Sequence, residues 1–281
     1  INMSSGSSEI GPVPQRFLVL ATFSALSACN NFLWLTFAPI RETSAIFFGV
    51  SGDAIDWLSM IYMALYPFLF APAAFFIEAD GHALRKGLRV AAWAQALGAL
   101  LRWLSCGNRS FALLLLGQTV CAAAQGITLG APPRIAALWF AERELGAATG
   151  AGVLANQVGP AVAYFLVPRV VSGAGRGLSR LLAWEFVVAV VVALSMLTIP
   201  AVPPRPPSAI AAGREQHDEA KTFREFLASL RDICRLRPIR ALSLGYCLAV
   251  GTLYAVSTDL AILLPNETTS EVSLVGGAML L

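Results

Sequence analysis

The sequence has 281 residues, of which 57% are hydrophobic and only 13% are charged, and its formal net charge is +3. A soluble domain carries about 25% charged residues, so this chain has too few charges to cover a water-facing surface. The basic residues fall in loops rather than in one stripe, which excludes a nucleic-acid-binding footprint. The five cysteines and two histidines are widely spaced and form no C-x-x-C motif, which argues against a disulfide framework or a zinc site. The composition therefore predicts an integral membrane protein.

Apolar runs recur along the chain at the length that a membrane-spanning helix needs, about 20 residues. In chain order, these runs cover Phe17–Ile40, Trp57–Ile77, Leu88–Cys106, Phe111–Pro133, Leu145–Pro168, Leu181–Val202 and Ala241–Leu264, and an eighth run begins at Val272. The first run is too long for the core of a signal peptide, and no small-residue cleavage site stands out. The sequence therefore predicts an all-α membrane protein with seven spans and the start of an eighth.

A polar segment, residues 203–240, separates the sixth run from the seventh. It opens on Pro203-Pro-Arg-Pro-Pro207, a stiff sequence that cannot continue a helix. Further on, between Thr222 and Arg231, apolar side chains recur on one helical face: Phe223, Phe226, Leu227 and Leu230. This pattern predicts an amphipathic helix, which either lies on the membrane surface or packs on the bundle as a connector.

The distribution of basic residues predicts an orientation, because Lys and Arg favour cytoplasmic loops. With a cytoplasmic amino terminus, 14 of the 20 basic residues lie on the cytoplasmic side, and 6, Arg102 among them, lie on the opposite side. Both N-x-[ST] sequons, which begin at Asn108 and Asn266, then fall outside. We therefore expect a multi-pass protein with a cytoplasmic amino terminus, in the plasma membrane, with an organelle membrane as the alternative.

Six spans, a long basic loop and then further spans form the plan of the major facilitator superfamily, whose halves are repeats around a central binding site. This plan predicts a cytoplasmic tail (residues 1–16), an amino-terminal six-helix repeat (17–202), a cytoplasmic loop (203–240) and the start of the carboxy-terminal repeat (241–281). Because a complete member has two six-span halves, we expect a truncated helical bundle. The chain is then either a fragment of a longer protein or a truncated product.

Six short motifs stand in order along the predicted spans. They are Asn30-Asn-Phe-Leu-Trp34, Asp56-Trp-Leu-Ser-Met-Ile-Tyr-Met63, Leu116-Gly-Gln118, Pro133-Arg-Ile-Ala-Ala-Leu-Trp139-Phe140, Val153-Leu-Ala-Asn-Gln157-Val-Gly159 and Tyr254-Ala-Val-Ser-Thr258. Together they resemble the feline leukaemia virus subgroup C receptor-related transporters, over nearly all of the chain. The resemblance implies a facilitative transporter of choline or ethanolamine that works by alternating access. Haem transport within the same family is the alternative that the resemblance also implies.

The resemblance implies a substrate site at Trp34, Gln157 and Tyr254, with Met63 as a further candidate, and Asn30 is added as a candidate from its position one turn before Trp34. Aromatic faces suit a quaternary ammonium, which has no N–H to donate and cannot lose its charge. Asn30 precedes Trp34 by one helical turn, so the two share a face that is too polar to meet lipid. The alternatives are packing roles for Trp34 and Met63 and an interhelical hydrogen bond for Gln157.

Two carboxylates lie within predicted spans, Glu185 and Asp259, and such residues are functional candidates by default. Glu185 comes near the start of its run, where we expect the membrane interface, and Asp259 comes near the outer end of its run. Proton coupling through either residue is an alternative to these solvated positions. Arg134 follows two prolines at the inner end of the fourth run, and we expect it to pair with Glu142 or Glu144.

No enzymatic activity, catalytic residue, cofactor or metal site is expected. The expected partners are a small-molecule substrate (choline, ethanolamine or haem) and the lipid bilayer, with no nucleic acid, and the chain is expected to be monomeric. Haem suits the sequence less, because iron favours His or Tyr, whereas His82 and His217 both lie in polar loops. A non-transporting receptor or sensor is the hypothesis of another class, because seven spans and part of an eighth do not form two complete repeats.

Overall fold

The computed structural model describes residue 11, residues 13–173, 175–208, 222–263 and 275–276, and residue 278, without the side chains of residues 257–263. The side chain of Asp259, the whole of His217 and most of the predicted eighth run therefore lie outside the described residues. Within these ranges the chain is built from helices, and its one β-bridge joins Ser172 to Arg176.

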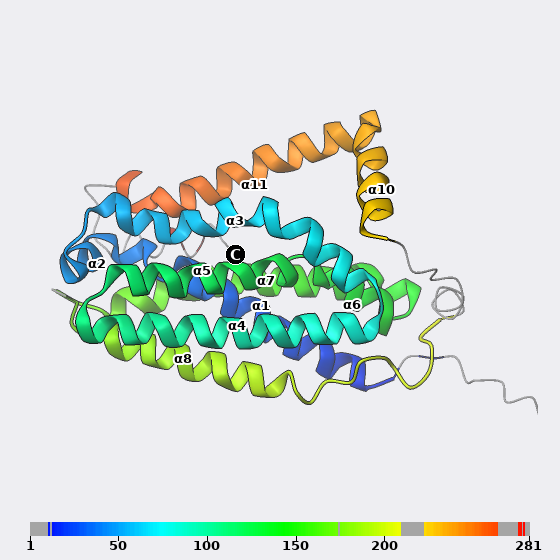
Figure 1. Ribbon diagram of the computed structural model, residues 1–281, viewed down its shortest axis with the longest axis horizontal. Coiled ribbons are helices and arrows are strands. Elements are labelled where there is room, and N and C mark those ends of the chain that lie inside the picture. The colour runs from blue at the N-terminus through cyan, green and yellow to red at the C-terminus, as the bar shows by residue number, and fades with distance from the viewer. Residues whose placement is uncertain are drawn as a thin grey trace, which may run out of the picture.

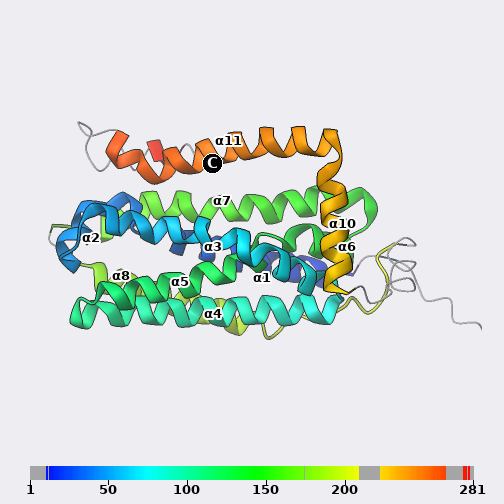
Figure 2. The same cartoon turned by 45° about the horizontal axis from the view of Figure 1, so that its top comes forward.

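The helices form an elongated bundle in which the long members run roughly parallel or antiparallel to one another (Figures 1 and 2). In chain order they are α1 (Gln15–Leu35), the 3₁₀ helix η1 (Ala38–Ile40), α2 (Arg41–Phe48), α3 (Gly52–Glu78), α4 (Gly81–Asn108), α5 (Phe111–Thr128), α6 (Ala131–Trp139), the 3₁₀ helix η2 (Glu142–Glu144), α7 (Leu145–Val170), α8 (Leu178–Ser195), α10 (Phe223–Arg235) and α11 (Arg237–Leu263). The prediction of an all-α bundle is confirmed. The division of the chain into a complete and an incomplete repeat stays a prediction.

The first predicted span is interrupted before its end. α1 stops at Leu35, and the chain continues through η1 and the short helix α2. Pro39 lies in η1, and because its ring nitrogen carries no hydrogen, it cannot donate to a carbonyl one turn earlier. α2 then ends at Gly49, whose φ of 67° is the left-handed conformation common after a helix.

Short polar side chains explain where the next helices begin. Ser51, Asp80 and Ser110 precede α3, α4 and α5, and each accepts a hydrogen bond from a backbone N–H three residues on. Such caps satisfy N–H groups that have no partner within the helix. Because Asp80 caps α4, this helix starts well before Leu88, and its first two turns belong to the segment that the sequence predicted as a loop.

In the part of the chain that the structure describes, six segments are long and apolar enough to cross a membrane. They are Gln15–Phe48, Gly52–Glu78, Phe111–Thr128, Glu142–Val170, Leu178–Ser195 and Arg237–Val256. The helix that contains the third predicted span, α4, is 28 residues long but more polar, since it includes Arg85, Lys86, Arg89 and Arg102. It packs along both α5 and α8 within the bundle. The described helices therefore build an integral, multi-pass membrane protein.

Glycines permit the closest helix contacts. A Cβ on Gly98 of α4 would lie 2.6 Å from the carbonyl oxygen of Gly117, and a Cβ on Gly117 of α5 would lie 2.7 Å from that of Gly98. A Cβ on Gly159 of α7 would clash with the carbonyl oxygen of Ala28 in α1. Membrane helices commonly approach each other through small residues. The α4–α5 and α1–α7 pairs are accordingly the most extensive in the structure.

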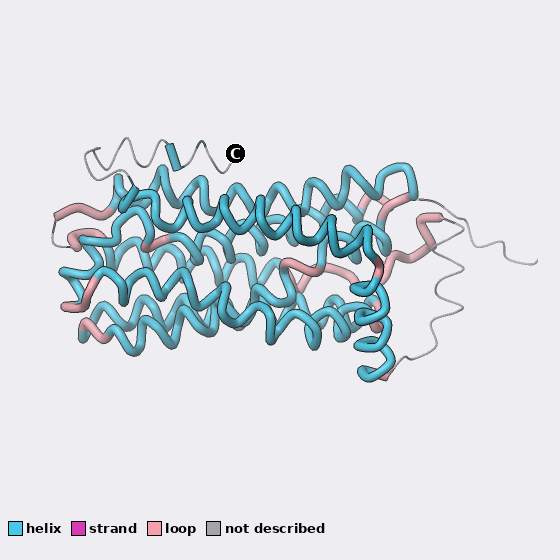
Figure 3. The backbone as a smooth tube through the Cα atoms, turned by 90° about the horizontal axis from the view of Figure 1, so that it is seen from above, coloured by secondary structure: helices cyan, strands magenta, loops and turns pink. Residues whose placement is uncertain are grey.

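The predicted amphipathic helix is present as α10, which lies across the end of the bundle (Figure 3). Its Phe223 and Phe226 rings pack against Phe75 of α3, at centroid distances of 5.2 and 5.6 Å. Phe223 and Leu227 nevertheless remain 41% exposed. The helix thus packs on the bundle through part of its apolar face, as the connector role predicts, and its contact with the membrane surface stays a prediction.

The ion pair predicted for Arg134 is wrong. Its Nη1 lies 3.8 Å from the Glu78 carboxylate, and its Nη2 donates to the Glu78 carbonyl oxygen at 3.0 Å. Glu144 pairs instead with Arg16, at 2.7 Å. Because α6 packs beside α3, the last residue of α3 comes closer to Arg134 than the acidic residues that follow it in the sequence.

Candidate functional site

Trp34 and Tyr254 lie on helices that are far apart in the sequence, α1 and α11, and their rings are in contact. The ring centroids are 5.0 Å apart and the planes meet at 69°, which is an edge-to-face arrangement. Trp34 is buried, and its indole Nε1 donates a 3.1 Å hydrogen bond to the carbonyl oxygen of Ser59 on α3. Tyr254 is half-buried. The structure thus brings together two of the residues that the resemblance implies as a substrate site, and Trp34 does not face lipid.

A third ring, which the sequence analysis missed, completes this aromatic cluster. Tyr62 of α3 is fully buried, and its ring centroid lies 6.5 Å from that of Trp34. Its hydroxyl group has no hydrogen-bond partner in the described part of the chain. The motif that ends at Met63 contains Tyr62, but adjacent helical residues point about 100° apart. With Tyr62 turned inward, Met63 is 37% exposed.

Two buried amides flank Trp34. Asn30, one turn before it, donates from Nδ2 to the carbonyl oxygen of Cys121 on α5 at 3.1 Å. Gln118 of α5 places its Nε2 within hydrogen-bond distance of the carbonyl oxygens of Leu33, Trp34 and Leu58, at 3.2, 3.4 and 3.0 Å. The Oδ1 of Asn30 and the Oε1 of Gln118 accept no hydrogen bond from any described residue. Both oxygens therefore keep an unused acceptor in the interior.

Gln157, on α7, makes no hydrogen bond to these groups in the described part of the chain. Its Oε1 is buried and has no hydrogen-bond partner within the described residues. Neither a hydrogen bond nor a ring contact among those residues joins it to Trp34 or Tyr254. The neighbouring Asn156 instead makes the interhelical contact, donating from Nδ2 to Ser27 Oγ of α1 at 3.3 Å. The roles of Gln157 and Met63 in the site stay predictions.

A buried ion pair joins α4 to α8. Arg102 Nη2 lies 2.9 Å from Glu185 Oε2, and the two side chains are 0% and 3% exposed. Thr36, just beyond α1, donates from Oγ1 to Glu185 Oε1 at 2.8 Å. The solvated position expected for Glu185 is therefore wrong, whereas the side of the membrane expected for Arg102 stays a prediction. α4 extends to Asn108 and α8 begins at Leu178, so each charge lies about two turns inside its helix, opposite the other.

The same ion pair supports the interrupted end of α1. The carbonyl groups in the last turn of a helix lack donors within that helix. Arg102 Nη1 donates to the carbonyl oxygen of Leu33 at 3.1 Å, beside the amide of Gln118. The Arg102 guanidinium carbon also lies 5.1 Å from the centroid of the Phe37 ring. A cation is favoured at a helix carboxyl end, so these side chains hold in place the backbone that carries Trp34.

The arrangement offers aromatic faces and neutral oxygen acceptors, while the nearest buried carboxylate is already paired. Such a site suits an organic cation that binds without a fixed counter-charge. Among the described residues, no group of three or more His, Cys, Asp or Glu side chains could hold a metal ion.

The fold and the buried site define the class: an integral, multi-pass membrane protein with a transporter architecture. Residues 18–281 match the sequence profile of the Major Facilitator Superfamily, and the chain belongs to that superfamily. The structure resembles a bacterial homologue of the human lysosomal transporter Spinster in an inward-facing, unoccupied conformation, with a TM-score of 0.68. That likeness, at 17% identity over 96% of this chain and 60% of the other, shows the fold alone.

Comparison with curated relatives confirms the family resemblance seen in the motifs. The chain is 34% identical over 265 residues to the choline/ethanolamine transporter FLVCR1 of Felis catus, covering 89% of this chain and 46% of the relative. It is also 34% identical over 257 residues to the choline/ethanolamine transporter flvcr2a of Danio rerio, covering 87% and 53%. The chain thus spans about half the length of these relatives.

Proposed function

We propose that the protein moves a small organic cation, choline or ethanolamine, across a membrane by facilitative alternating access. The observation that carries this proposal is the edge-to-face contact between Trp34 and Tyr254. A cation over an aromatic face gains about 0.5–2 kcal/mol, more when the site is desolvated. The names of the curated relatives support the same substrate class.

The geometry of the two rings supports a cation in particular. In an edge-to-face pair, the positive edge of one ring meets the negative face of the other. A quaternary ammonium presents the same sign of charge to that face, so it could take the place of one ring when the two separate. Trp34 and Tyr254 belong to different predicted repeats, and the repeats of such transporters move relative to each other around the bound substrate.

Ethanolamine places a further demand on the site, because its ammonium group has N–H donors. The unpartnered oxygen atoms of Asn30, Tyr62 and Gln118 are buried acceptors on the helices that surround Trp34. Glu185 is not required for either substrate, since its carboxylate pairs with Arg102. The same site could therefore serve both compounds, with the aromatic rings binding the cation and the amides accepting from N–H groups.

Uptake measurements test this proposal. Cells that express the full-length protein at the surface should accumulate labelled choline and labelled ethanolamine faster than cells with an empty vector, and each compound should compete with the other. Trp34→Ala, brought to the same surface level, should reduce the uptake of both. Uptake equal to that of the empty-vector cells, with the protein shown to be at the surface, would exclude the proposal.

We also propose a cytoplasmic amino terminus, from the excess of Lys and Arg on one side, and a location in the plasma membrane. Cys234 is an exposed thiol on α10, and α10 lies on the proposed cytoplasmic side. A membrane-impermeant maleimide should therefore label it only after the cells are permeabilised, and Cys234→Ser should remove that signal. Labelling of Cys234 in intact cells would show that the chain has the opposite orientation in the membrane.

A further inference from the structure

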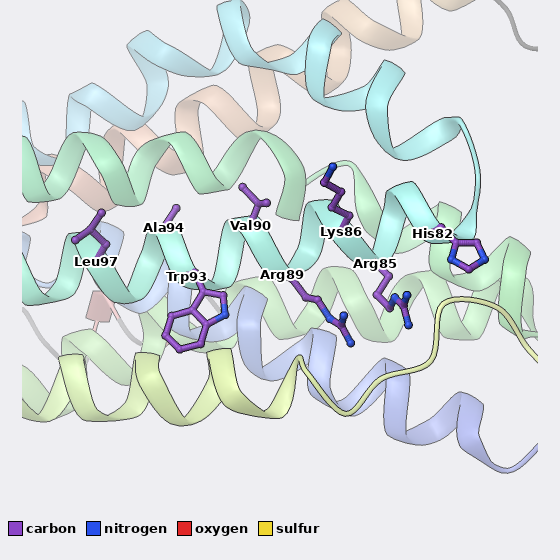
Figure 4. Close-up of a pocket in the computed structure, with 8 residues that line it drawn as sticks. All are labelled: His82, Arg85, Lys86, Arg89, Val90, Trp93, Ala94 and Leu97. Atoms are coloured by element: carbon purple, nitrogen blue, oxygen red, sulfur yellow. The ribbon is translucent and has the colours of Figure 1, made fainter.

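One face of α4 carries a shallow groove whose lining changes from cationic to apolar along the helix. The groove is lined by His82, Arg85, Lys86, Arg89, Val90, Trp93, Ala94 and Leu97. Figure 4 shows these side chains in two rows, with Lys86, Val90, Ala94 and Leu97 along one edge of the helix and the others along the opposite edge. From His82 to Leu97 the helix rises by about 22 Å. We call this surface the α4 groove.

The cationic half of the α4 groove has no carboxylate among its lining residues. The two acidic residues just before α4 are engaged elsewhere: Asp80 accepts from the N–H of Ala83 at 2.6 Å, and Glu78 lies 3.8 Å from Arg134. Arg85 and Lys86 make no hydrogen bond or ion pair within the ranges that the structure describes. Their charges are therefore not compensated by the side chains described around them.

Arg89 lies where the lining of the groove changes from cationic to apolar, and hydrogen bonds hold its side chain in place. Its Nε donates to the carbonyl oxygen of Met196 at 3.1 Å, and its Nη2 donates to that of Leu197 at 2.7 Å. Both acceptors follow the end of α8. The guanidinium is thus held between α4 and the segment after α8, with the unpartnered Arg85 and Lys86 on the turn before it.

The apolar half of the α4 groove continues from Arg89 along the helix. Val90, Trp93 and Leu97 are 56%, 44% and 51% exposed. The helix rises about 12 Å from Arg89 to Leu97, which fits within one leaflet of a hydrocarbon core about 30 Å thick. Trp is also favoured at the boundary between headgroups and acyl chains. With α4 across the bilayer, this order would set the cations at headgroup depth and the large apolar side chains at acyl-chain depth.

We propose that the α4 groove binds an anionic phospholipid. Its phosphate lies among Arg85, Lys86 and Arg89, and one acyl chain follows Val90, Trp93 and Leu97. Arg and Lys are the usual partners of phosphate oxygens, and a basic cluster next to a membrane span attracts anionic lipids. Only an amphipathic ligand matches both halves. A free phosphate leaves the apolar half empty, and an acidic peptide has no long acyl chain to fill it.

Native mass spectrometry of the purified full-length protein can test this binding with dioleoylphosphatidylserine as the probe. Dioleoylphosphatidylcholine, with the same chains and no net charge, should bind more weakly, and glycerophosphoserine, which has no chains, should not compete. Each Lys or Arg near an anionic surface contributes about fivefold in affinity. The double variant Arg85→Gln/Lys86→Gln should therefore bind dioleoylphosphatidylserine about 25-fold more weakly, and Trp93→Gln should also weaken it.

The matched control is Arg176→Gln/Arg180→Gln, which removes two exposed charges at the opposite end of the bundle and should leave lipid binding unchanged. The thermal unfolding temperature of both double variants should stay near that of the wild type, which separates lost binding from lost folding. Unchanged lipid affinity in Arg85→Gln/Lys86→Gln would overturn the proposal. Competition by glycerophosphoserine equal to that of the lipid would also overturn it, because the acyl chain would then contribute nothing.

Discussion

Arg102 and Glu185 form an ion pair in the interior of the bundle, with 2.9 Å between Nη2 and Oε2 and almost no exposed side-chain surface. Removing two charges from water costs several kcal/mol for each ion, and only good geometry with further hydrogen bonds offsets that cost. The Leu33 carbonyl in the last turn of α1 and the Thr36 hydroxyl just beyond that helix supply those hydrogen bonds. The pair therefore couples three helices: α4, α8 and the interrupted end of α1.

Removing one member of this pair should be more damaging than removing both. Arg102→Met or Glu185→Leu leaves the other charge buried without its partner, which should lower the free energy of unfolding by about 3–5 kcal/mol. The double variant should be more stable than either single variant. Thermal unfolding of the purified proteins would check this, and losses that simply add would show that the two residues are not coupled.

The aromatic pair should control choline affinity. Trp34→Ala and Tyr254→Ala should each weaken choline binding by about 1–2 kcal/mol, roughly tenfold. Because Trp34 is buried, its replacement by Ala also opens a cavity that costs about 3–5 kcal/mol of stability. Affinity must therefore be measured on the folded fraction, for instance by calorimetry after size-exclusion chromatography.

Phe variants separate the ring face from the polar atoms. Tyr254→Phe should change choline affinity less than Trp34→Phe, because indole is the strongest cation–π ring and Trp34→Phe also loses the hydrogen bond to Ser59. Trp184→Ala is the matched control, since this Trp lies on the outer surface of α8 and is 63% exposed. If affinity stays unchanged in both Ala variants, or falls equally in Trp184→Ala, the aromatic pair is not the site.

Gln118 should stabilise the protein through the carbonyl groups it contacts. In Gln118→Met a side chain of similar size cannot donate to Leu33, Trp34 or Leu58, and a buried polar group left unpaired costs about 1–3 kcal/mol. We expect a lower free energy of unfolding by about that amount, measured by thermal or denaturant unfolding. Gln15→Met, at an exposed position on α1, should have little effect, and equal losses in both would contradict the assigned role.

Gly159 should be required for the contact between α1 and α7. In Gly159→Ala the added Cβ meets the backbone of Ala28 and Phe32, which cannot move without separating the helices. We expect a marked loss of folded protein on size-exclusion chromatography. Gly150→Ala in the same helix meets nothing within 4 Å and should be neutral or stabilising by up to about 1 kcal/mol. Normal folding of Gly159→Ala would show that the two helices can repack.

Most of the long helices could be predicted from the sequence, because a bilayer requires long apolar segments and six of the described segments meet that requirement. The break in the first span could also have been predicted, since Pro39 lies inside that apolar run. It was missed because the run was identified by its apolar length alone. α4 starts earlier than predicted because Asp80 caps it, and a capping residue in a polar segment is easily read as part of a loop.

The site was harder to predict, because its chemistry depends on which side chains meet. The pairing of Arg102 with Glu185 follows from the packing of α4 against α8, and nothing in either run indicates its partner. Tyr62 was missed because a shift of one helical position decides whether it or Met63 faces inward. Trp34 and Tyr254 came from the family resemblance, and no rule of periodicity would have selected them.

The polarity of α4 has a consequence for how the protein is made. An Arg at the centre of a helix costs about 2.5–3.5 kcal/mol when that helix is inserted into a bilayer on its own, and Arg102 lies about two turns from the end of α4. α4 is also the long helix within the first six predicted spans that falls short of the apolar composition of a span. The charge that compensates Arg102 arrives only with α8, after three further helices have been synthesised. We therefore expect α4 to remain loosely inserted, and open to quality-control factors, until α8 leaves the ribosome.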